Sequence, residues 1–321
     1  MFDGETARFA NREIRVKAAV CTRYGPPDVL QLVDLPVPVP RGGEVRIRIR
    51  ATSVTSSDTY VRGLQLNLAY RLMARLAVGW TAPRQPVLGM VLSGEVDCVG
   101  DGVSTFKPHD QVFGFDRHRF GTYAQYVCWP EDGLLAIRPP GLTDEDAAAI
   151  PYGGLLALSF LRKAGVGPGQ EVLVYGASGA VGTSAVQLAG HLGARVTGVC
   201  GPSNGELVRS LGAARVIDYT REDLSAGPER YDVVLDAVGK RKSAAALKRC
   251  AQVLAPGGRC ISVDDGTPKL LREDLVLLGQ LAQAGEIRPV IDRRFTLDDI
   301  VEAHRYVDGG HKRGNVVITV P

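Results

Sequence analysis

Three glycines, Gly176, Gly179 and Gly182, are regularly spaced in the stretch YGASGAVG, which lies between the apolar run EVLV and the helix-like run TSAVQLAGHLG. In a strand–turn–helix setting, the first glycine permits a tight turn and the second lets the backbone approach a pyrophosphate. The third allows close packing of the helix on the strand, and unbonded N–H groups at the helix N-terminus attract the anion. We therefore expect a dinucleotide site made by Gly176, Ser178, Gly179, Ala180, Val181 and Gly182.

Two other interpretations of this stretch compete with a dinucleotide site. The glycines could serve the turn alone, without any ligand. The stretch could also be the nucleophile elbow of a hydrolase, because Ser178 lies between a strand and a helix. That motif, G-x-S-x-G, requires glycine at the position that Ala180 occupies, so we reject the hydrolase. The simple turn stays open as an alternative.

The loop after the next expected strand indicates which dinucleotide is bound. NAD sites place an acidic residue about 20 residues after the glycines, where it binds the ribose 2′-hydroxyl. This chain has VCGPSNG in that region, with no acidic residue. A carboxylate would repel a 2′-phosphate, so its absence favours NADPH, with NADH as the alternative. Ser203 and Asn204 can donate hydrogen bonds to the phosphate, whereas Arg209 lies further into the following helix.

The predicted secondary structure around this turn changes at Pro139 and Pro140. Before them, the runs KAAVCT, VLQLVDL, EVRIRIRATSV and LSGEVDCVG predict strands joined by Pro and Gly turns. After them, TDEDAAAI opens a helix with Thr143 as N-cap and Asp146 close to a capping-box position. Short apolar strands then alternate with helices, which predicts a parallel sheet buried on both faces.

Composition excludes several broad classes of protein. The 321 residues carry a formal net charge of +3, which is too small to indicate nucleic-acid or membrane binding by itself. No apolar run approaches the roughly 18 residues of a membrane span. The six cysteines are scattered without a C-x-x-C pair, which favours reduced thiols and a cytoplasmic location.

Motifs spread along residues 17–321 resemble the medium-chain dehydrogenase/reductase superfamily. GEVDCVGDGVSTFKPHDQVFGF is similar to its G-x-V-x-x-V-G signature, and AAAIPYGGLLALSFLRKAGVGPGQEVLVYGASGAVG to its zinc-independent quinone oxidoreductase branch. The resemblance implies an α/β fold, with a Rossmann-type doubly wound parallel sheet in one domain and a β-rich GroES-like catalytic domain. The expected boundaries are 1–140 for the GroES-like domain, completed by about 287–321, and 141–286 for the Rossmann domain.

The same resemblance implies that no metal takes part. Zinc-dependent members have a cysteine where this chain has Thr55 and a His-Glu pair where it has Met90 and Val91, and the structural-zinc lobe is missing. Without a Lewis acid, the suitable hydride acceptors are quinones or α,β-unsaturated carbonyls. We expect an NADPH-dependent reductase of such a small molecule. A reductase or dehydrogenase of simple alcohols and aldehydes, and an NADPH-binding regulatory protein without turnover, remain the alternatives.

Similarity to the family also implies individual site residues. Tyr60 is expected to donate its hydroxyl to the substrate oxygen, with Thr55 as a second polar contact, although either could be a packed structural residue. Asp58 and Arg62 are expected to form a structural ion pair, with a role as acid and base as the alternative. Around the cofactor, similarity points to Ser203, Asn204, Tyr219, Val238, Gly239 and Asn315, while a core aromatic and a plain turn are the alternatives for Tyr219 and Gly239.

Several features depart from the family pattern. Leu156 stands where relatives often have threonine. Residues 262–275 run almost directly from strand to helix, without the longer insert that builds the usual dimer edge, so a homodimer stays open. Residues 1–16 precede the usual start, and residues 64–82 are expected to form a short helix over the cleft. The basic run GKRKSAAALKRC is expected to be a solvated helix face, which argues against nucleic acid.

Overall fold

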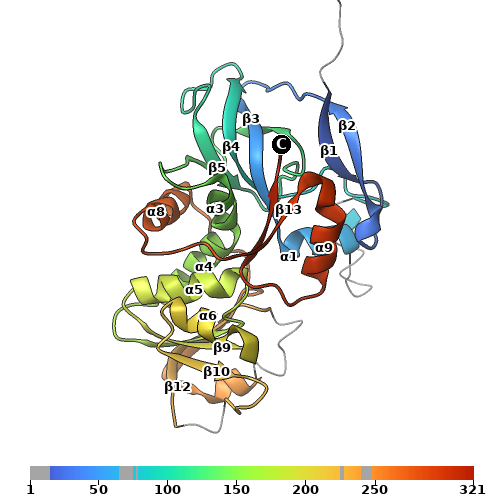
Figure 1. The fold of residues 1–321 in the computed structure, drawn as a ribbon. Helices are drawn as coiled ribbons and strands as arrows, with labels where there is room; N and C mark the ends of the chain where they lie inside the picture. The colour runs from blue at the N-terminus through green and yellow to red at the C-terminus, as the bar shows by residue number, and fades with distance from the viewer. Residues whose placement is uncertain (1–14, 65–74, 77–78, 225–227, 240–247) are drawn as a thin grey trace, which may run out of the picture.

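Two sheets organise the protein, one in each half of the view in Figure 1. The computed structural model describes residues 15–64, 75–76, 79–224, 228–239 and 248–321. Most of the helix expected over residues 64–82, nearly all of the arm 1–16 and the first basic residues of the run 239–250 lie outside this part of the chain.

A five-stranded parallel sheet forms one half of the protein, in the order β10-β9-β8-β11-β12. Its central strands β8 and β11 are short and largely buried, as expected for a sheet covered on both faces, whereas the edge strand β12 is mostly exposed or half-buried. The order reverses between β8 and β11, which is the point where doubly wound sheets bind ligands. The strands are β8 (Glu171–Tyr175), β9 (Arg195–Cys200), β10 (Arg215–Asp218), β11 (Tyr231–Asp236) and β12 (Leu254–Ser262).

Helices alternate with these strands, which confirms the Rossmann-type half of the predicted fold. α4 and α5 pack against each other between the two sheets (Figure 1). The chain runs from β12 straight into α8 through residues 263–271, and β12 pairs with β11 alone among the described strands. The helices are α4 (Pro151–Ala164), α5 (Ala180–His191), α6 (Gly205–Ser210) and α8 (Arg272–Gln283), with the 3-10 turn η2 (Pro202–Asn204) before α6.

A mostly antiparallel sheet forms the β-rich half. Its order is β13-β14-β3-β4-β5-β7, and β6 also pairs with β3. Strand β14, near the C-terminus, pairs with β3 near the N-terminus, so that Val316 lies opposite Val54. The strands are β3 (Glu44–Val54), β4 (Val91–Val99), β5 (Gln111–Phe115), β6 (Tyr126–Pro130), β7 (Leu135–Ile137), β13 (Ile291–Thr296) and β14 (Asn315–Thr319).

Smaller elements complete this half, and the whole confirms the predicted combination of a GroES-like and a Rossmann-type unit. The domain boundaries at 140/141 and 286/287 remain predictions. The elements are the antiparallel pair β1 (Arg15–Cys21) and β2 (Leu30–Pro36), the helices α1 (Ser56–Gly63), α3 (Asp144–Ala149) and α9 (Ile300–Asp308), and the 3-10 turns η1 (Pro27–Val29) and η3 (Leu297–Asp299).

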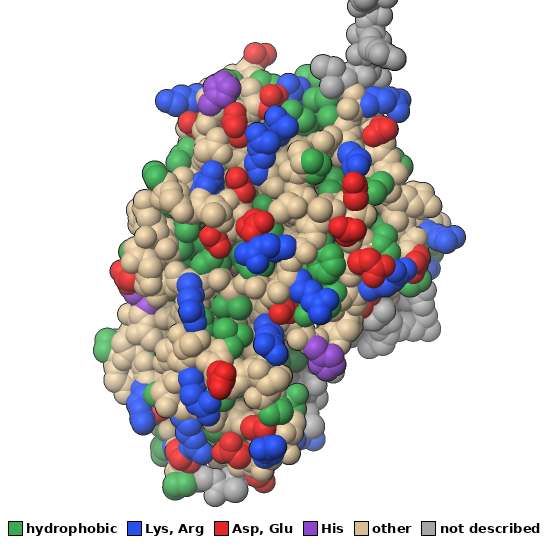
Figure 2. All heavy atoms as spheres, in the orientation of Figure 1, with side chains coloured by type: hydrophobic (Ala, Val, Ile, Leu, Met, Phe, Trp, Pro, Cys, Tyr) green, Lys and Arg blue, Asp and Glu red, His purple; other side chains and the backbone are tan. Residues whose placement is uncertain are grey.

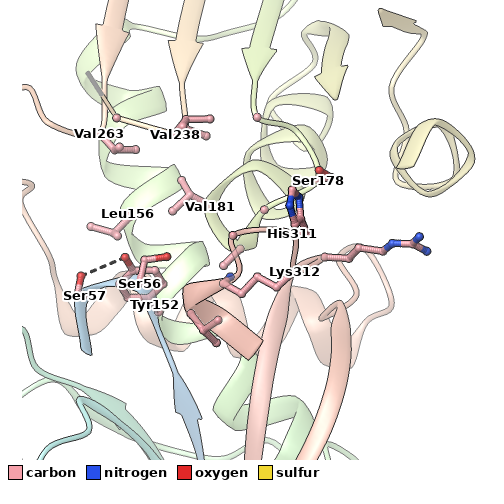
Figure 3. Close-up of a pocket in the computed structure, with 18 of the residues that line it drawn as sticks. Ser56, Ser57, Tyr152, Leu156, Ser178, Val181, Val238, Val263, His311 and Lys312 are labelled. Carbon is pink, nitrogen blue, oxygen red and sulfur yellow. Dashed lines mark hydrogen bonds between the residues drawn. The ribbon is translucent and has the colours of Figure 1, made fainter. Parts of the chain in front are cut away.

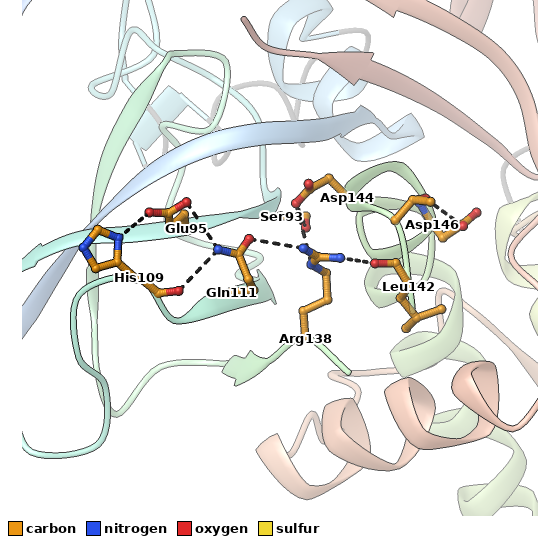
Figure 4. Close-up of polar contacts among 9 residues, drawn as sticks. Ser93, Glu95, His109, Gln111, Arg138, Leu142, Asp144 and Asp146 are labelled. Atoms are coloured by element: carbon orange, nitrogen blue, oxygen red, sulfur yellow. Dashed lines mark hydrogen bonds and ion pairs between the residues drawn. The ribbon is translucent and has the colours of Figure 1, made fainter. Parts of the chain in front are cut away.

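Polar contacts fix the chain where it passes from one half to the other (Figure 4). Arg138, just after β7, donates from Nη2 to Gln111 Oε1 at 3.1 Å and from Nη1 to the carbonyl of Leu142. Ser93 on β4 donates to Asp144 Oδ1 at 2.8 Å, which holds the start of α3 against the antiparallel sheet. Hydrogen bonds therefore hold residues 138–144, which connect the two halves, to the antiparallel sheet.

The apolar core is continuous between the two halves at this connection. Thr143 caps α3 by accepting a hydrogen bond from the Asp146 N–H at 3.0 Å, which confirms the predicted helix start. One cluster of buried side chains includes Phe113 and Phe115 from the antiparallel sheet together with Leu155 of α4 and Leu278 of α8. Because both halves share this core, we expect them to hold the cavity between them in a fixed shape.

Candidate functional site

A cavity of about 1270 Å³ lies at the carboxyl ends of β8 and β11, facing α1 of the other half. It is larger than the roughly 300–1,000 Å³ of common small-molecule sites, so it has room for a dinucleotide and a substrate together. Tyr175 and Val238 line it from the parallel sheet, and Ser57 and Tyr60 line it from α1. Figure 3 shows strand-end valines at one end of this cavity and the hydroxyls of Ser56, Ser57 and Tyr152 at the other.

The three glycines have different roles in the turn. Gly176 has φ +80°, and a Cβ there would overlap the side chain of Val238. A Cβ on Gly182 would lie 2.7 Å from the Cα of Ala177, so this glycine permits close helix–strand packing. A Cβ on Gly179 would have the Gly176 carbonyl oxygen, at 3.7 Å, as its nearest neighbour beyond the adjoining residues, and Gly179 is the N-cap of α5. Gly179 thus leaves open space beside a helix N-terminus, as a pyrophosphate site requires.

A segment close to the C-terminus lies against this turn. The Gly314 N–H donates to the Ser178 carbonyl at 2.8 Å, and Gly179 and Gly314 form a parallel β-bridge. This contact brings basic side chains to the glycine turn, and Figure 3 draws one of them on the same side of the cavity as Ser178. Our reasoning from the sequence missed these residues, although GGHKRG is a visible basic turn. The lining residues that this segment adds include His311, Lys312 and Arg313.

Asn315, which we expected to close over the cofactor, is not among the residues that line the cavity. Its side chain is buried, and its Nδ2 donates to the Val290 carbonyl at 3.2 Å. Its backbone N–H donates to the same carbonyl at 2.8 Å. Asn315 therefore holds the start of β14 to Val290 through two hydrogen bonds.

The loop after β9 forms the far end of the cavity. Asn204 Nδ2 donates to Ser178 Oγ at 3.2 Å, which ties this loop to the glycine turn. The buried Asn204 Oδ1 has no hydrogen-bond partner among the described residues, so a ligand donor has an acceptor here. Ser203 and Tyr219 also line the cavity, and the Tyr219 side chain is 53% exposed. That exposure excludes the core-aromatic alternative for Tyr219.

Val238 and Gly239 form the turn after β11, and both line the cavity. Their backbone N–H groups donate to Oδ1 of the buried Asp236, at 3.1 and 3.2 Å. The other carboxylate oxygen of Asp236 accepts from Ser262 Oγ at 2.7 Å. Asp236 therefore fixes the turn by side-chain bonds, a role that the sequence pattern alone did not indicate.

A pair of hydroxyl groups lies at the opposite end of the cavity. Ser57 Oγ and Tyr152 Oη share a hydrogen bond of 3.1 Å (Figure 3), and the Tyr152 ring meets Phe115 edge-on at 5.8 Å. Burial raises the pKa of Tyr152, so its hydroxyl keeps its proton and can donate. Tyr60 lines the same region. We did not predict Tyr152, and its only sequence signal is its place in PYGG at the start of α4.

Thr55 is the N-cap of α1 and does not line the cavity. Its hydroxyl donates to Asp58 Oδ2 at 2.6 Å and accepts from the Asp58 N–H at 3.2 Å. The structure thus commits Thr55 to a capping box. Burial raises the pKa of Asp58 to about 6, against hydrogen bonds from Thr55 that lower it.

The predicted ion pair between Asp58 and Arg62 is wrong. The guanidinium of Arg62, only 1% exposed, pairs with Asp308 of α9 and donates to the Gly25 carbonyl at 2.9 Å. Asp58 and Arg62 are four residues apart on α1, but the packing of α9 against α1 supplies Asp308 as the acid for Arg62.

The positions at which relatives hold zinc do not fit the metal. Thr55 is committed to its cap, and Met90, a thioether, is a poor zinc ligand. Val91 has no donor atom. Within the described ranges, no three His, Cys, Asp or Glu side chains gather as a metal site would need.

The surface offers no single-signed patch on the face that Figure 2 shows. Lys and Arg side chains there are interspersed with Asp and Glu over both halves of the described chain. Lys248 and Arg249 of the basic run are exposed. None of the helices that the structure describes has the length and apolar character to cross a bilayer.

Comparisons with known proteins agree with this architecture. An alcohol dehydrogenase GroES-like domain model matches residues 41–139, and zinc-binding dehydrogenase models match residues 180–285 and 265–318. A 2-methylene-furan-3-one reductase of Solanum lycopersicum is 32% identical over 98% of this chain and 81% of its own length. An NADPH-dependent alkenal/one oxidoreductase of Arabidopsis thaliana is 29% identical over 94% and 79%.

A solved structure extends the likeness to the whole fold. The quinone oxidoreductase from Coxiella burnetii is 29% identical, has a TM-score of 0.81, and the match covers 96% of this chain and 100% of that one. The chain belongs to the medium-chain dehydrogenase/reductase superfamily, as its motifs predicted. Within that superfamily it is an NAD(P)H-dependent oxidoreductase, and its relatives are consistent with the quinone oxidoreductase branch.

Proposed function

We propose that the protein transfers a hydride from NADPH to a quinone or an α,β-unsaturated carbonyl compound bound in the cavity between the two sheets. The observation that carries the proposal is the cavity itself. One end has the open glycine turn at the N-terminus of α5, and the other has the bonded hydroxyls of Ser57 and Tyr152. One space can therefore hold a dinucleotide and a polarised carbonyl together.

The residues around the turn fit a dinucleotide. The open space at Gly179 and the α5 N-terminus suit the pyrophosphate, and the turn after β11 suits the part that lies across the sheet. Ser203, Asn204 and Tyr219 surround the place of the adenosine ribose, and the absence of a carboxylate there favours NADPH over NADH. When bound, the nicotinamide supplies the hydride.

The chain's own groups orient and stabilise the substrate. Val181 and Leu156, which Figure 3 draws between the strand-end valines and the hydroxyls, provide an apolar surface for a flat, conjugated molecule. Tyr152, held by Ser57, can donate a hydrogen bond to the oxygen on which negative charge develops, and Tyr60 is a second candidate donor. One such donor is typically worth about 2.7–4 kcal/mol in a water-poor site. Because Thr55 and Met90 do not fit zinc, we assign this stabilisation to hydroxyl groups.

A dehydrogenase or reductase of alcohols and aldehydes is the second candidate, because the matching family models describe a zinc-binding dehydrogenase and an alcohol dehydrogenase GroES-like domain. The proposed reductase and this dehydrogenase differ in the hydride acceptor that each needs. A saturated aldehyde has no conjugated position for hydride attack, so its reduction requires strong polarisation of the carbonyl itself. A cytoplasmic location remains a prediction from the six scattered cysteines, all of which are free.

The test is the oxidation of NADPH and NADH with a benzoquinone, a naphthoquinone, an enal, an enone and a saturated aldehyde, each with and without a chelator. Turnover of a quinone or an enone with NADPH, unaffected by the chelator, is expected. Turnover confined to the saturated aldehyde and lost with the chelator would support the dehydrogenase. Tight NADPH binding without turnover of any compound would contradict the reductase and favour a regulatory role.

A further inference from the structure

A second cavity of about 820 Å³ adjoins the first. Arg117, His118 and Pro268 line both cavities, so the two meet at these side chains. Four segments line the second cavity: Thr105 before β5, the loop after β5, the turn at residues 131–134, and residues 267–273 at the end of the connection from β12 and the start of α8. The short connection after β12 thus forms part of its wall.

Arg117 is the cation at this junction whose donors are unused. Its side chain makes no hydrogen bond or ion pair within the part of the chain that the structure describes. Two other arginines nearby are committed: Arg272 donates to the Gly133 carbonyl at 3.0 Å, and Arg119 pairs with Glu44 at 3.3 Å. Oδ1 of the adjacent Asp116 accepts the backbone N–H groups of His118 and Arg119.

Arg117 also lies close enough to the catalytic end to act on it. Its charge lowers the pKa of Tyr152, against the larger effect of burial. A half-buried guanidinium beside the reacting region, with free donors, suits a carboxylate, which it can bind through two parallel hydrogen bonds.

The second cavity also has acidic side chains in its lining, together with Arg272, whose guanidinium donates to the carbonyls of Glu131 and Gly133. Glu131, Asp132 and Glu273 line it, and Glu131 Oε2 accepts the backbone N–H groups of Ser104 and Thr105 at 3.0 and 2.9 Å. An anionic group that reached past Arg117 would meet these acids. The favourable place for an anion is therefore narrow and lies at the junction.

We propose that Arg117 binds a carboxylate carried by the substrate, at a fixed distance from the double bond that is reduced. This inference rests on the proposed function and narrows its substrate class to enones or enals that bear an acid group. It requires a length optimum, because a short chain does not reach Arg117 and a long one brings the carboxylate to the acidic residues of the second cavity.

The experiment uses straight-chain enones that end in a carboxylate at increasing distances from the carbonyl, each matched with a methyl-ended analogue. The full-length protein and the variants Arg117→Gln and Arg119→Gln are compared by kcat/KM and by NADPH affinity. Arg119→Gln is the matched control, since Arg119 lines neither cavity and pairs with Glu44.

At the best chain length, Arg117→Gln is expected to lower kcat/KM for the carboxylate by about 10- to 100-fold, mainly through KM, as for a lost charged hydrogen bond. The methyl-ended analogue and the control should change by less than about twofold. Equal losses on both compounds, no length optimum, or weaker NADPH binding by Arg117→Gln would overturn the inference. If neither series is reduced, the proposed function itself fails.

Discussion

Replacing Gly179 with alanine is expected to weaken NADPH binding about 10- to 100-fold while the free energy of unfolding changes by less than about 1 kcal/mol. The residue has φ −81°, a conformation that alanine adopts without strain. Its added Cβ would lie 3.7 Å from the carbonyl oxygen of Gly176, which is an ordinary contact. The protein alone should therefore accept this methyl group.

The magnitude follows from what the methyl group displaces. It would occupy the space beside the first N–H groups of α5, where we place the pyrophosphate. Each hydrogen bond to a charged group is worth about 1.5–3 kcal/mol, and about 1.4 kcal/mol is a factor of ten in affinity. The loss of one such bond accounts for the range given.

The assay combines a fluorescence titration with NADPH and urea unfolding without ligand. Gly190→Ala is the matched control, because Gly190 is on the same helix, is exposed, and would have no atom within 4 Å of its Cβ. It should leave affinity unchanged. Gly182→Ala should instead destabilise the fold by about 1–3 kcal/mol, since its Cβ would collide with Ala177 and the Gly176 carbonyl.

Unchanged NADPH affinity in Gly179→Ala would refute the assignment of the pyrophosphate to this turn. A loss of affinity that only follows a loss of stability would refute the reasoning about open space. In that case the methyl group would have disturbed the turn itself.

Three further substitutions test the polar groups. Tyr152→Phe should lower kcat about 100-fold and leave NADPH affinity unchanged, as for the loss of one oxyanion donor, and an unchanged kcat would reassign the donor. Asp58 has a pKa of about 6, raised from 3.8, so its contribution to the free energy of unfolding should fall by about 3 kcal/mol as pH rises from about 4 to 6. Urea unfolding of Asp58→Asn should show no such fall. Burial lowers the pKa of His304 from 6.5 to about 3, so its stability contribution is lost as pH falls through this window, and His304→Leu should unfold with less dependence on pH there than the parent.

The local part of the fold could be predicted because its causes are local. Short apolar strands, the N-cap Thr143 and the glycine spacing each act within a few residues of the chain. The strand–turn–helix unit around Gly179 therefore follows from the sequence.

The missing parts of the site depend on contacts between distant segments. Arg62 pairs with Asp308 because α9 packs on α1. The sequence of neither helix indicates that the two pack together. Residues 311–313 reach the glycine turn only through the bond from Gly314 to Ser178. Tyr152 gained its partner, Ser57, from the opposite half of the protein.

Strand β14 also decides the order in which the protein can fold. Its partner β3 leaves the ribosome early. Val54 of β3 cannot pair with Val316 until Val316 has been synthesised, close to the end of translation. The parallel sheet, by contrast, draws all its strands from one continuous stretch, Glu171–Ser262, and can form first. The half that is made first is therefore completed last, and until then the Ala51–Val54 end of β3, beyond the residues that pair with β6, is an unpaired edge open to wrong pairing with other chains.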